Sequence, residues 1–69
     1  MKKFTVKEIE EKFNDSFENA MTDFVESCLR QGFYEVEPCV RYFMNENQLL
    51  ESEYDLVKKT YCEILDSYN

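Results

Sequence analysis

A single apolar pattern in the first half of the chain constrains the fold more than any other feature. Its members follow one another at intervals of 3, 4, 4, 3, 4 and 4 residues, and only an α-helix keeps such a series on one face. The series consists of Val6, Ile9, Phe13, Phe17, Ala20, Phe24 and Cys28. It predicts one long helix over residues 6–31. Residues 14–16 prefer helix caps, so the helix could be kinked or could restart there, although the uninterrupted series favours continuity.

Signals for the two ends of this helix flank the pattern. Thr5 followed by Glu8 forms a capping-box pattern, so we expect the helix to begin near Val6. Gly32 can adopt the left-handed conformation that ends a helix, with Phe33 folding back onto the last turn.

The second half of the chain predicts two further helices. Pro38 suits the first turn of a helix, and a short helix is expected over residues 38–45. A near-heptad series predicts a third helix over residues 48–67, with apolar members at Leu50, Tyr54, Val57, Tyr61, Ile64, Leu65 and Tyr68. We therefore expect an all-α fold: a small three-helix bundle, with a long, a short and a long helix, in one domain over residues 1–69.

The small size of the chain favours self-association. A domain of 69 residues hides only about 60% of the surface that its unfolded chain exposes, so its core is thin. Leu49 and Leu56 lie off the main face of the third helix, and Met21 and Val25 flank the apolar face of the first. These strips predict a homodimer whose interface is formed by Met21, Val25, Leu49, Leu56 and Tyr68.

The charge of the chain limits its partners. Fifteen acidic and eight basic residues give a net charge of -7, which repels nucleic acid and anionic membranes. No segment approaches the ~20 apolar residues of a membrane-spanning helix. The three cysteines are an odd number without close pairs and are typical of reduced thiols. We therefore expect a soluble, cytoplasmic protein.

The sequence offers no set of catalytic or metal-binding residues. It contains no histidine, and its cysteines are separated by 11 and 23 residues, unlike the paired spacing of a zinc site. It also lacks a glycine-rich phosphate loop and a Ser/His/Asp set. We therefore expect no cofactor, no metal and no enzymatic activity.

A row of carboxylates follows the opposite side of the first predicted helix. On a continuous helix these side chains would occupy one quadrant, about 5–6 Å apart, which is close to the spacing of phosphates along a nucleic-acid strand. They are Glu8, Glu11, Asp15, Glu18 and Glu26. One interpretation is that they bind a basic cleft in a partner protein. The alternative is the solvated face that every amphipathic helix has.

Two aromatic groups offer further contact surfaces. Tyr54, Tyr61 and Tyr68 lie on one side of the third helix, and such a stripe is either the core of a bundle or an interface. Phe33 and Tyr34, which neighbour acidic residues in the expected loop, could also anchor a partner.

The combination of small size, strong acidity, helical pattern and no catalytic set defines the expected function. In composition the chain resembles the inhibitors that phages and mobile elements direct at host nucleic-acid machinery, including anti-CRISPR proteins. The resemblance implies a protein-binding inhibitor or regulator, possessing a DNA-mimicking acidic surface, and it assigns no residues. The alternative hypothesis is a structural or assembly subunit that uses apolar helix faces for oligomerisation.

Overall fold

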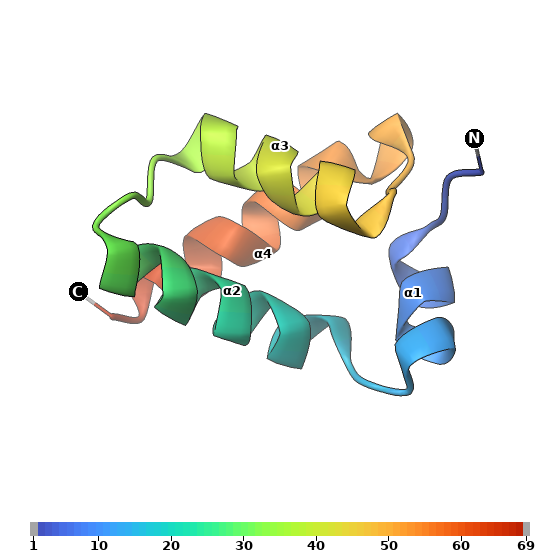
Figure 1. Ribbon diagram of the computed structural model, residues 1–69, viewed down its shortest axis with the longest axis horizontal. Helices are drawn as coiled ribbons and strands as arrows, with labels where there is room; N and C mark the ends of the chain where they lie inside the picture. The colour runs from blue at the N-terminus through green and yellow to red at the C-terminus, as the bar shows by residue number, and fades with distance from the viewer. Residues whose placement is uncertain (1, 69) are drawn as a thin grey trace.

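The computed structural model describes residues 2–68, and these residues form an all-helical globule (Figure 1). Met1 and Asn69, the outermost residues of the predicted domain, lie outside the described residues. Within residues 2–68 there are four α-helices, one short 3₁₀ helix and no strand. The elements are α1 (Val6–Phe13), α2 (Phe17–Gln31), α3 (Val36–Asn47), η1 (Glu51–Glu53) and α4 (Tyr54–Asp66). The all-α prediction is confirmed.

The single helix predicted over residues 6–31 is wrong, because the chain breaks between α1 and α2. Asn14 ends α1 in the left-handed conformation, with φ 54°. Ser16 then caps α2, since its hydroxyl accepts a hydrogen bond from the N–H of Asn19 at 3.1 Å. The carboxylate of Asp15 also accepts from the N–H of Ser16 at 2.9 Å. These local bonds give the backbone an alternative to the helix, so the cap residues override the apolar periodicity.

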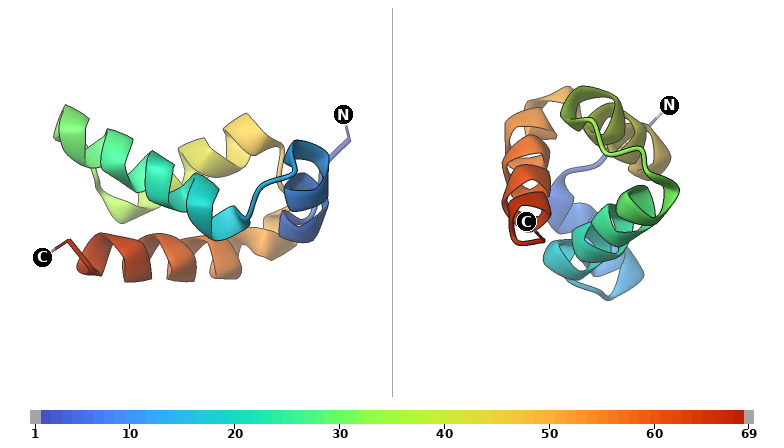
Figure 2. Two further views of the ribbon diagram at one scale, coloured as in Figure 1. Left: turned by 90° about the horizontal axis from the view of Figure 1, so that it is seen from below. Right: turned by 90° about the vertical axis from the view of Figure 1, so that its left-hand side faces the viewer.

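The break turns α1 away from α2 and changes which residues are buried. In Figure 1 and in the left view of Figure 2, α1 lies at one end of the molecule and runs across the direction of α2. The Phe13 side chain is 60% exposed, and its ring lies 5.5 Å from the ammonium group of Lys12. The buried face of α2 consists of Phe17, Met21, Val25 and Cys28, whereas Ala20 and Phe24 are only partly buried.

The helices of the second half differ from their predicted bounds. α3 begins at Val36 rather than at residue 38, and it runs on to Asn47 before Gln48 ends it in the left-handed conformation. The helix predicted over residues 48–67 begins only at Tyr54, after an irregular connection and η1.

This connection pairs with the segment that precedes α1. The N–H of Phe4 donates to the carbonyl of Gln48 at 2.8 Å, and the N–H of Leu50 donates to the carbonyl of Phe4 at 2.9 Å. The two bonds frame an isolated parallel bridge between Phe4 and Leu49. Leu49 is therefore pulled into the core and is only 2% exposed.

α4 packs against both α2 and α3, and the three helices surround a shared core (Figures 1 and 2). Its buried residues are Val57 and Tyr61. The rings of Phe17 and Phe24 pack edge-on against Phe43 of α3, with centroids 5.9 and 5.2 Å apart. Tyr61 of the predicted tyrosine stripe is thus a core residue, whereas Tyr68 is exposed.

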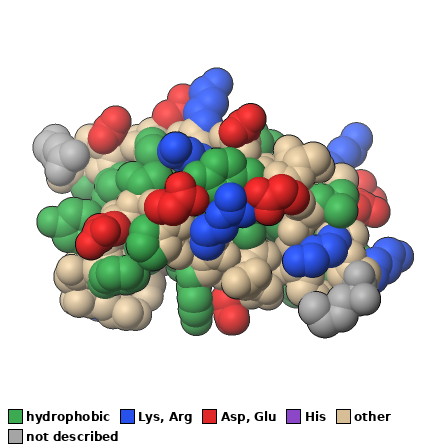
Figure 3. Space-filling view, turned by 90° about the horizontal axis from the view of Figure 1, so that it is seen from above, with side chains coloured by type: hydrophobic (Ala, Val, Ile, Leu, Met, Phe, Trp, Pro, Cys, Tyr) green, Lys and Arg blue, Asp and Glu red, His purple; other side chains and the backbone are tan. Residues whose placement is uncertain are grey.

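The face that carries α3 mixes acidic, basic and hydrophobic side chains (Figure 3). Arg41 makes ion pairs with Glu37 at 3.3 Å and Glu51 at 2.8 Å, and its guanidinium lies 4.2 Å from the centre of the Tyr54 ring. The Tyr54 hydroxyl donates to Glu37 and holds the pKa of that carboxyl below its usual value. This group ties α3 to η1 and α4. Within residues 2–68 no helix is both long and apolar enough to cross a bilayer.

Candidate functional site

The five carboxylates that were predicted to form a row, which we call the carboxylate ladder, do not share one helix face. Glu8 and Glu11 lie on α1, Asp15 lies in the break, and Glu18 and Glu26 lie on α2. Because α1 and α2 run in different directions, the regular spacing that resembles a phosphate backbone is lost. The expectation of a continuous ladder is therefore wrong, although all five residues are exposed.

Three of these carboxylates accept hydrogen bonds from within the protein. Glu8 completes the predicted capping box by accepting from the N–H of Thr5 at 2.8 Å. Asp15 accepts from Ser16 as described, and Glu26 accepts from the hydroxyl of Tyr68 at 3.1 Å. In the described part of the chain, Glu11 and Glu18 have no hydrogen bond or ion pair to their side chains. The ladder residues therefore divide into three that stabilise the fold and two that face solvent.

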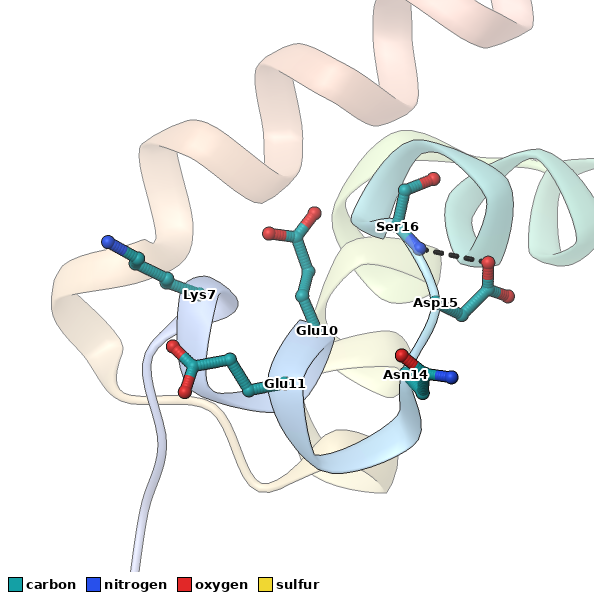
Figure 4. A pocket seen from close by; sticks show the side chains of 6 residues that line it. All are labelled: Lys7, Glu10, Glu11, Asn14, Asp15 and Ser16. Atoms are coloured by element: carbon teal, nitrogen blue, oxygen red, sulfur yellow. Dashed lines mark hydrogen bonds between the residues drawn. The ribbon is translucent and has the colours of Figure 1, made fainter.

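A shallow hollow of about 500 Å³ lies at the corner between α1 and α2 (Figure 4). Its lining residues are Lys7, Glu10, Glu11, Asn14, Asp15 and Ser16. The carboxylate of Glu10 reaches across the break and accepts a hydrogen bond from the N–H of Phe17 at 2.6 Å. Nowhere in residues 2–68 do three or more Cys, Asp or Glu side chains form a group able to hold a metal ion. We interpret the hollow as the structural corner of the α1–α2 turn.

The predicted dimer surface is mostly inside the protein. Met21 and Val25 are fully buried because α2 turns this face toward the core, and Leu49 is buried by its bridge to Phe4. The expectation that these three residues form an exposed strip is therefore wrong. Leu56 and Tyr68 are each 47% exposed and still available for contact.

A second and more apolar hollow lies between α2 and α3. We call it the α2–α3 groove; it has a volume of about 540 Å³. Its lining consists of Phe24, Ser27, Cys28 and Gln31 of α2, Phe33 of the connecting loop, and Pro38, Cys39 and Tyr42 of α3. Of the lining residues, only Phe33 was predicted from the sequence as a contact for a partner. The others could not be found, because the periodicity of each helix does not show which sides of two helices face one another.

Aromatic side chains form the walls of the groove. The rings of Phe24 and Tyr42 lie nearly parallel, with centroids 6.2 Å apart and an angle of 12° between their planes. On α2, the amide of Gln31 donates to the hydroxyl of Ser27 at 3.2 Å and provides a polar edge. The groove thus combines a large apolar surface with few polar groups, which is typical of binding sites.

The loop at the rim of the groove is held in place from both sides. Gly32 has the predicted left-handed conformation, with φ 77°, and Phe33 donates back to the carbonyl of Cys28 at 3.1 Å. The Tyr61 hydroxyl donates from the core to the carbonyl of Tyr34 at 2.8 Å. The thiol of Cys39 lies 3.5 Å from the carbonyl of Phe33 and donates to it. The rim is therefore formed before any ligand binds.

The Cys28 thiol beside the groove is buried and stays protonated near neutral pH. Burial, together with the neighbouring Cys39, raises the pKa of Cys28 to about 11. A thiol is nucleophilic only as its thiolate, so Cys28 is unsuited to covalent catalysis at neutral pH. The lining of the groove is suited to binding an apolar group.

The groove lies in a strongly acidic part of the chain. Residues 13–40 contain six acidic residues and one basic residue, and all seven are exposed. Comparisons of the chain with models of protein families, with curated proteins and with solved structures find no match. The function must therefore be inferred from the geometry and charge of the site.

Proposed function

We propose that this protein is a protein-binding inhibitor or regulator that engages a basic surface of its partner through the acidic region of α2 and the α2–α3 loop. One observation carries the proposal: the only base among residues 13–40 is Arg30, against Asp15, Glu18, Asp23, Glu26, Glu35 and Glu37. A usual solvated face mixes charges of both signs more evenly. The bases of the chain lie mainly elsewhere, on the segment up to Lys12 and on α4.

Such a region acts on a partner through its electrostatic field. Like charges suppress contact with nucleic acid, while a basic protein surface is attracted and oriented before contact. Surfaces that bind nucleic acid carry clustered Lys and Arg, and occupying one would block its normal ligand. We therefore propose a nucleic-acid-binding protein as the target class, with phage or mobile-element inhibition as one setting. We place the interaction in the cytoplasm, which the three free cysteines favour.

Charge reversal tests the proposal. The partner is first identified by affinity capture from the native host and mass spectrometry. The double variant Glu18→Lys/Asp23→Lys should then weaken binding by more than about tenfold, because it places cations against cations. In the described residues neither side chain makes a hydrogen bond or ion pair, and losing the Glu18 carboxylate from the first turn of α2 should cost only about 0.3–1 kcal/mol, so the fold should be kept.

The matched control reverses two exposed carboxylates outside this region, Glu46→Lys and Glu63→Lys. It makes the same change in net charge and should alter affinity by less than about twofold at ordinary ionic strength. Equal loss in both double variants would show that only net charge matters and would overturn the proposed contact. Asp15 is avoided because its carboxylate supports the start of α2.

A second candidate function is an assembly subunit that forms a homodimer through apolar side chains. The exposure of Leu56 and Tyr68 on and after α4 favours it. Sedimentation equilibrium separates the candidates: apolar self-association should give twice the chain mass and persist in high salt, whereas binding through the acidic region should weaken with salt.

A further inference from the structure

The α2–α3 groove leaves aromatic surface in water. The Phe33 side chain is 52% exposed and the Tyr42 side chain 58% exposed, at the two sides of the same hollow. Aromatic side chains at the centre of a contact surface contribute a large share of binding energy in protein interfaces. The groove volume of about 540 Å³ also lies within the range of ~300–1,000 Å³ that is usual for ligand pockets.

The groove is ready to bind without rearrangement. Its floor and one wall are Phe24 and Cys28 of α2, which are held by packing against Phe43 and the core. Its rim is fixed by the hydrogen bonds from Tyr61 and Cys39 to the loop carbonyls. A site that is already ordered loses little conformational entropy on binding, so more of the contact energy appears as affinity.

Charge decides which occupant suits the groove. No lining residue is charged, but the surrounding chain over residues 13–40 is strongly acidic. A second copy of this chain would bring another net charge of -7 against this region, which disfavours it. An apolar side chain flanked by Lys or Arg matches both the apolar lining and the acidic surroundings.

We propose that the α2–α3 groove binds the apolar side chains of a cationic segment in a partner protein. The inference rests on the proposed function and adds a specific anchor to it. The aromatic walls receive the apolar side chains, and the exposed acidic residues of the segment 13–40 attract the flanking cations. The Ser27–Gln31 pair offers a hydroxyl and an amide to the backbone end of the segment.

Three synthetic peptides test the groove. The first is a fluorescein-labelled helical peptide of lysine and alanine that carries two phenylalanines one helical turn apart. The second has alanine in place of both phenylalanines, and the third has glutamate in place of every lysine. Fluorescence anisotropy should show the first peptide binding at least about tenfold more tightly than the other two. Equal affinity of the first two peptides would overturn the proposal.

Variants locate the contact. The double variant Phe33→Ala/Tyr42→Ala should weaken binding of the first peptide by about tenfold or more. The matched control is Phe13→Ala, which removes an equally exposed ring from α1, away from the groove, and should change affinity by less than about twofold. Circular dichroism checks that each variant keeps the helical content of the wild type. An equal effect of both variants would overturn the assignment to the groove.

The outcomes separate this inference from the proposed function. If Glu18→Lys/Asp23→Lys prevents binding of the native partner while Phe33→Ala/Tyr42→Ala binds like the wild type, the acidic contact stands and the groove is excluded. If Glu18→Lys/Asp23→Lys binds the native partner like the wild type while Phe33→Ala/Tyr42→Ala does not bind it, the proposed acidic contact is wrong. The cationic part of the inference is then wrong as well. If the wild type is a dimer that Phe33→Ala/Tyr42→Ala converts to a monomer, a second copy occupies the groove and the inference is wrong.

Discussion

The carboxylate of Glu10 accepts a hydrogen bond from the backbone N–H of Phe17, at 2.6 Å, across the break between α1 and α2. Glu53 does the same for α1, since it accepts from the N–H of Val6. The first N–H groups of a helix have no partner within it, and the positive end of the helix dipole favours a carboxylate there. Part of the acidity of this chain therefore stabilises helix starts.

The bond from Glu10 to Phe17 predicts a difference between two adjacent glutamates. Glu10→Ala should lower the free energy of unfolding by about 1–2 kcal/mol, because it leaves the backbone N–H of Phe17 without its acceptor. Glu11→Ala, which removes a carboxylate with no hydrogen bond in the described residues, should change it by less than about 0.5 kcal/mol. Urea denaturation of the two variants checks this. Equal losses would show that Glu10 has no capping role.

Among the described residues, the two non-glycine residues in the left-handed conformation predict different responses to glycine substitution. Gln48 has φ 55°, a conformation that costs a residue with a Cβ roughly 1 kcal/mol, so Gln48→Gly should raise the free energy of unfolding. Asn14 has φ 54°, but asparagine tolerates this region, so Asn14→Gly should be close to neutral. Thermal melts of both variants measure the difference. A fall in the melting temperature for Gln48→Gly would contradict it.

The changed burial of the phenylalanines predicts which ring the fold needs. Phe17 is buried against Phe43, and Phe17→Ala should cost about 3–5 kcal/mol of unfolding free energy. Phe13→Ala should cost less than about 0.5 kcal/mol, because that ring is mostly in solvent. Since the larger loss can unfold so small a domain, the loss of helical signal in circular dichroism is the measurement for Phe17→Ala. If Phe13→Ala lost its helical signal as Phe17→Ala is expected to, both rings would be buried, as one continuous first helix requires.

The buried thiol of Cys28 predicts a loss of stability at alkaline pH. Its pKa is raised to about 11 in the folded protein, whereas a thiol in the unfolded chain titrates near ~8.5. The unfolded chain therefore loses this proton first. The stabilising effect is fully present below pH ~8.5 and is lost progressively as the pH rises toward about 11.

The measurement is urea denaturation at pH values of about 8 and about 9, below the pKa of ~10 that tyrosine has in the unfolded chain, above which the raised pKa of Tyr61 also contributes. The free energy of unfolding should fall between these two values in the wild type. In Cys28→Ala the fall should be smaller. An identical fall in both proteins would show that another group is responsible.

The sequence predicted the helical class and several helix ends, because those signals are local. The capping box at Thr5 and Glu8 and the left-handed Gly32 are both confirmed. The continuity of the first helix was wrong because Phe13 and Phe17 are four residues apart, a spacing that fits an unbroken helix. The caps at Asn14 and Ser16 were visible in the sequence, but periodicity alone does not show that they prevail.

The surfaces were harder to predict, because they depend on contacts between distant segments. Once α1 and α2 are separate helices, α2 can rotate independently, and Met21 and Val25 become core residues. The burial of Leu49 depends on a bridge to Phe4 that no pattern near either residue indicates. The groove likewise requires α2 and α3 to present Phe24 and Tyr42 to one another, which local periodicity does not specify.

The bridge between Phe4 and Leu49 also bears on the order in which the protein is completed during synthesis. The hydrogen bonds that fix Phe4 and Val6 to the rest of the fold all involve residues 48–53. A ribosome makes the chain in the N-to-C direction, so α1 and α2, which are joined by the Glu10–Phe17 bond, emerge before residues 48–53 do. An eight-residue helix is also too short to be stable alone in water. The start of α1 is therefore fixed in place only after η1 has left the ribosome.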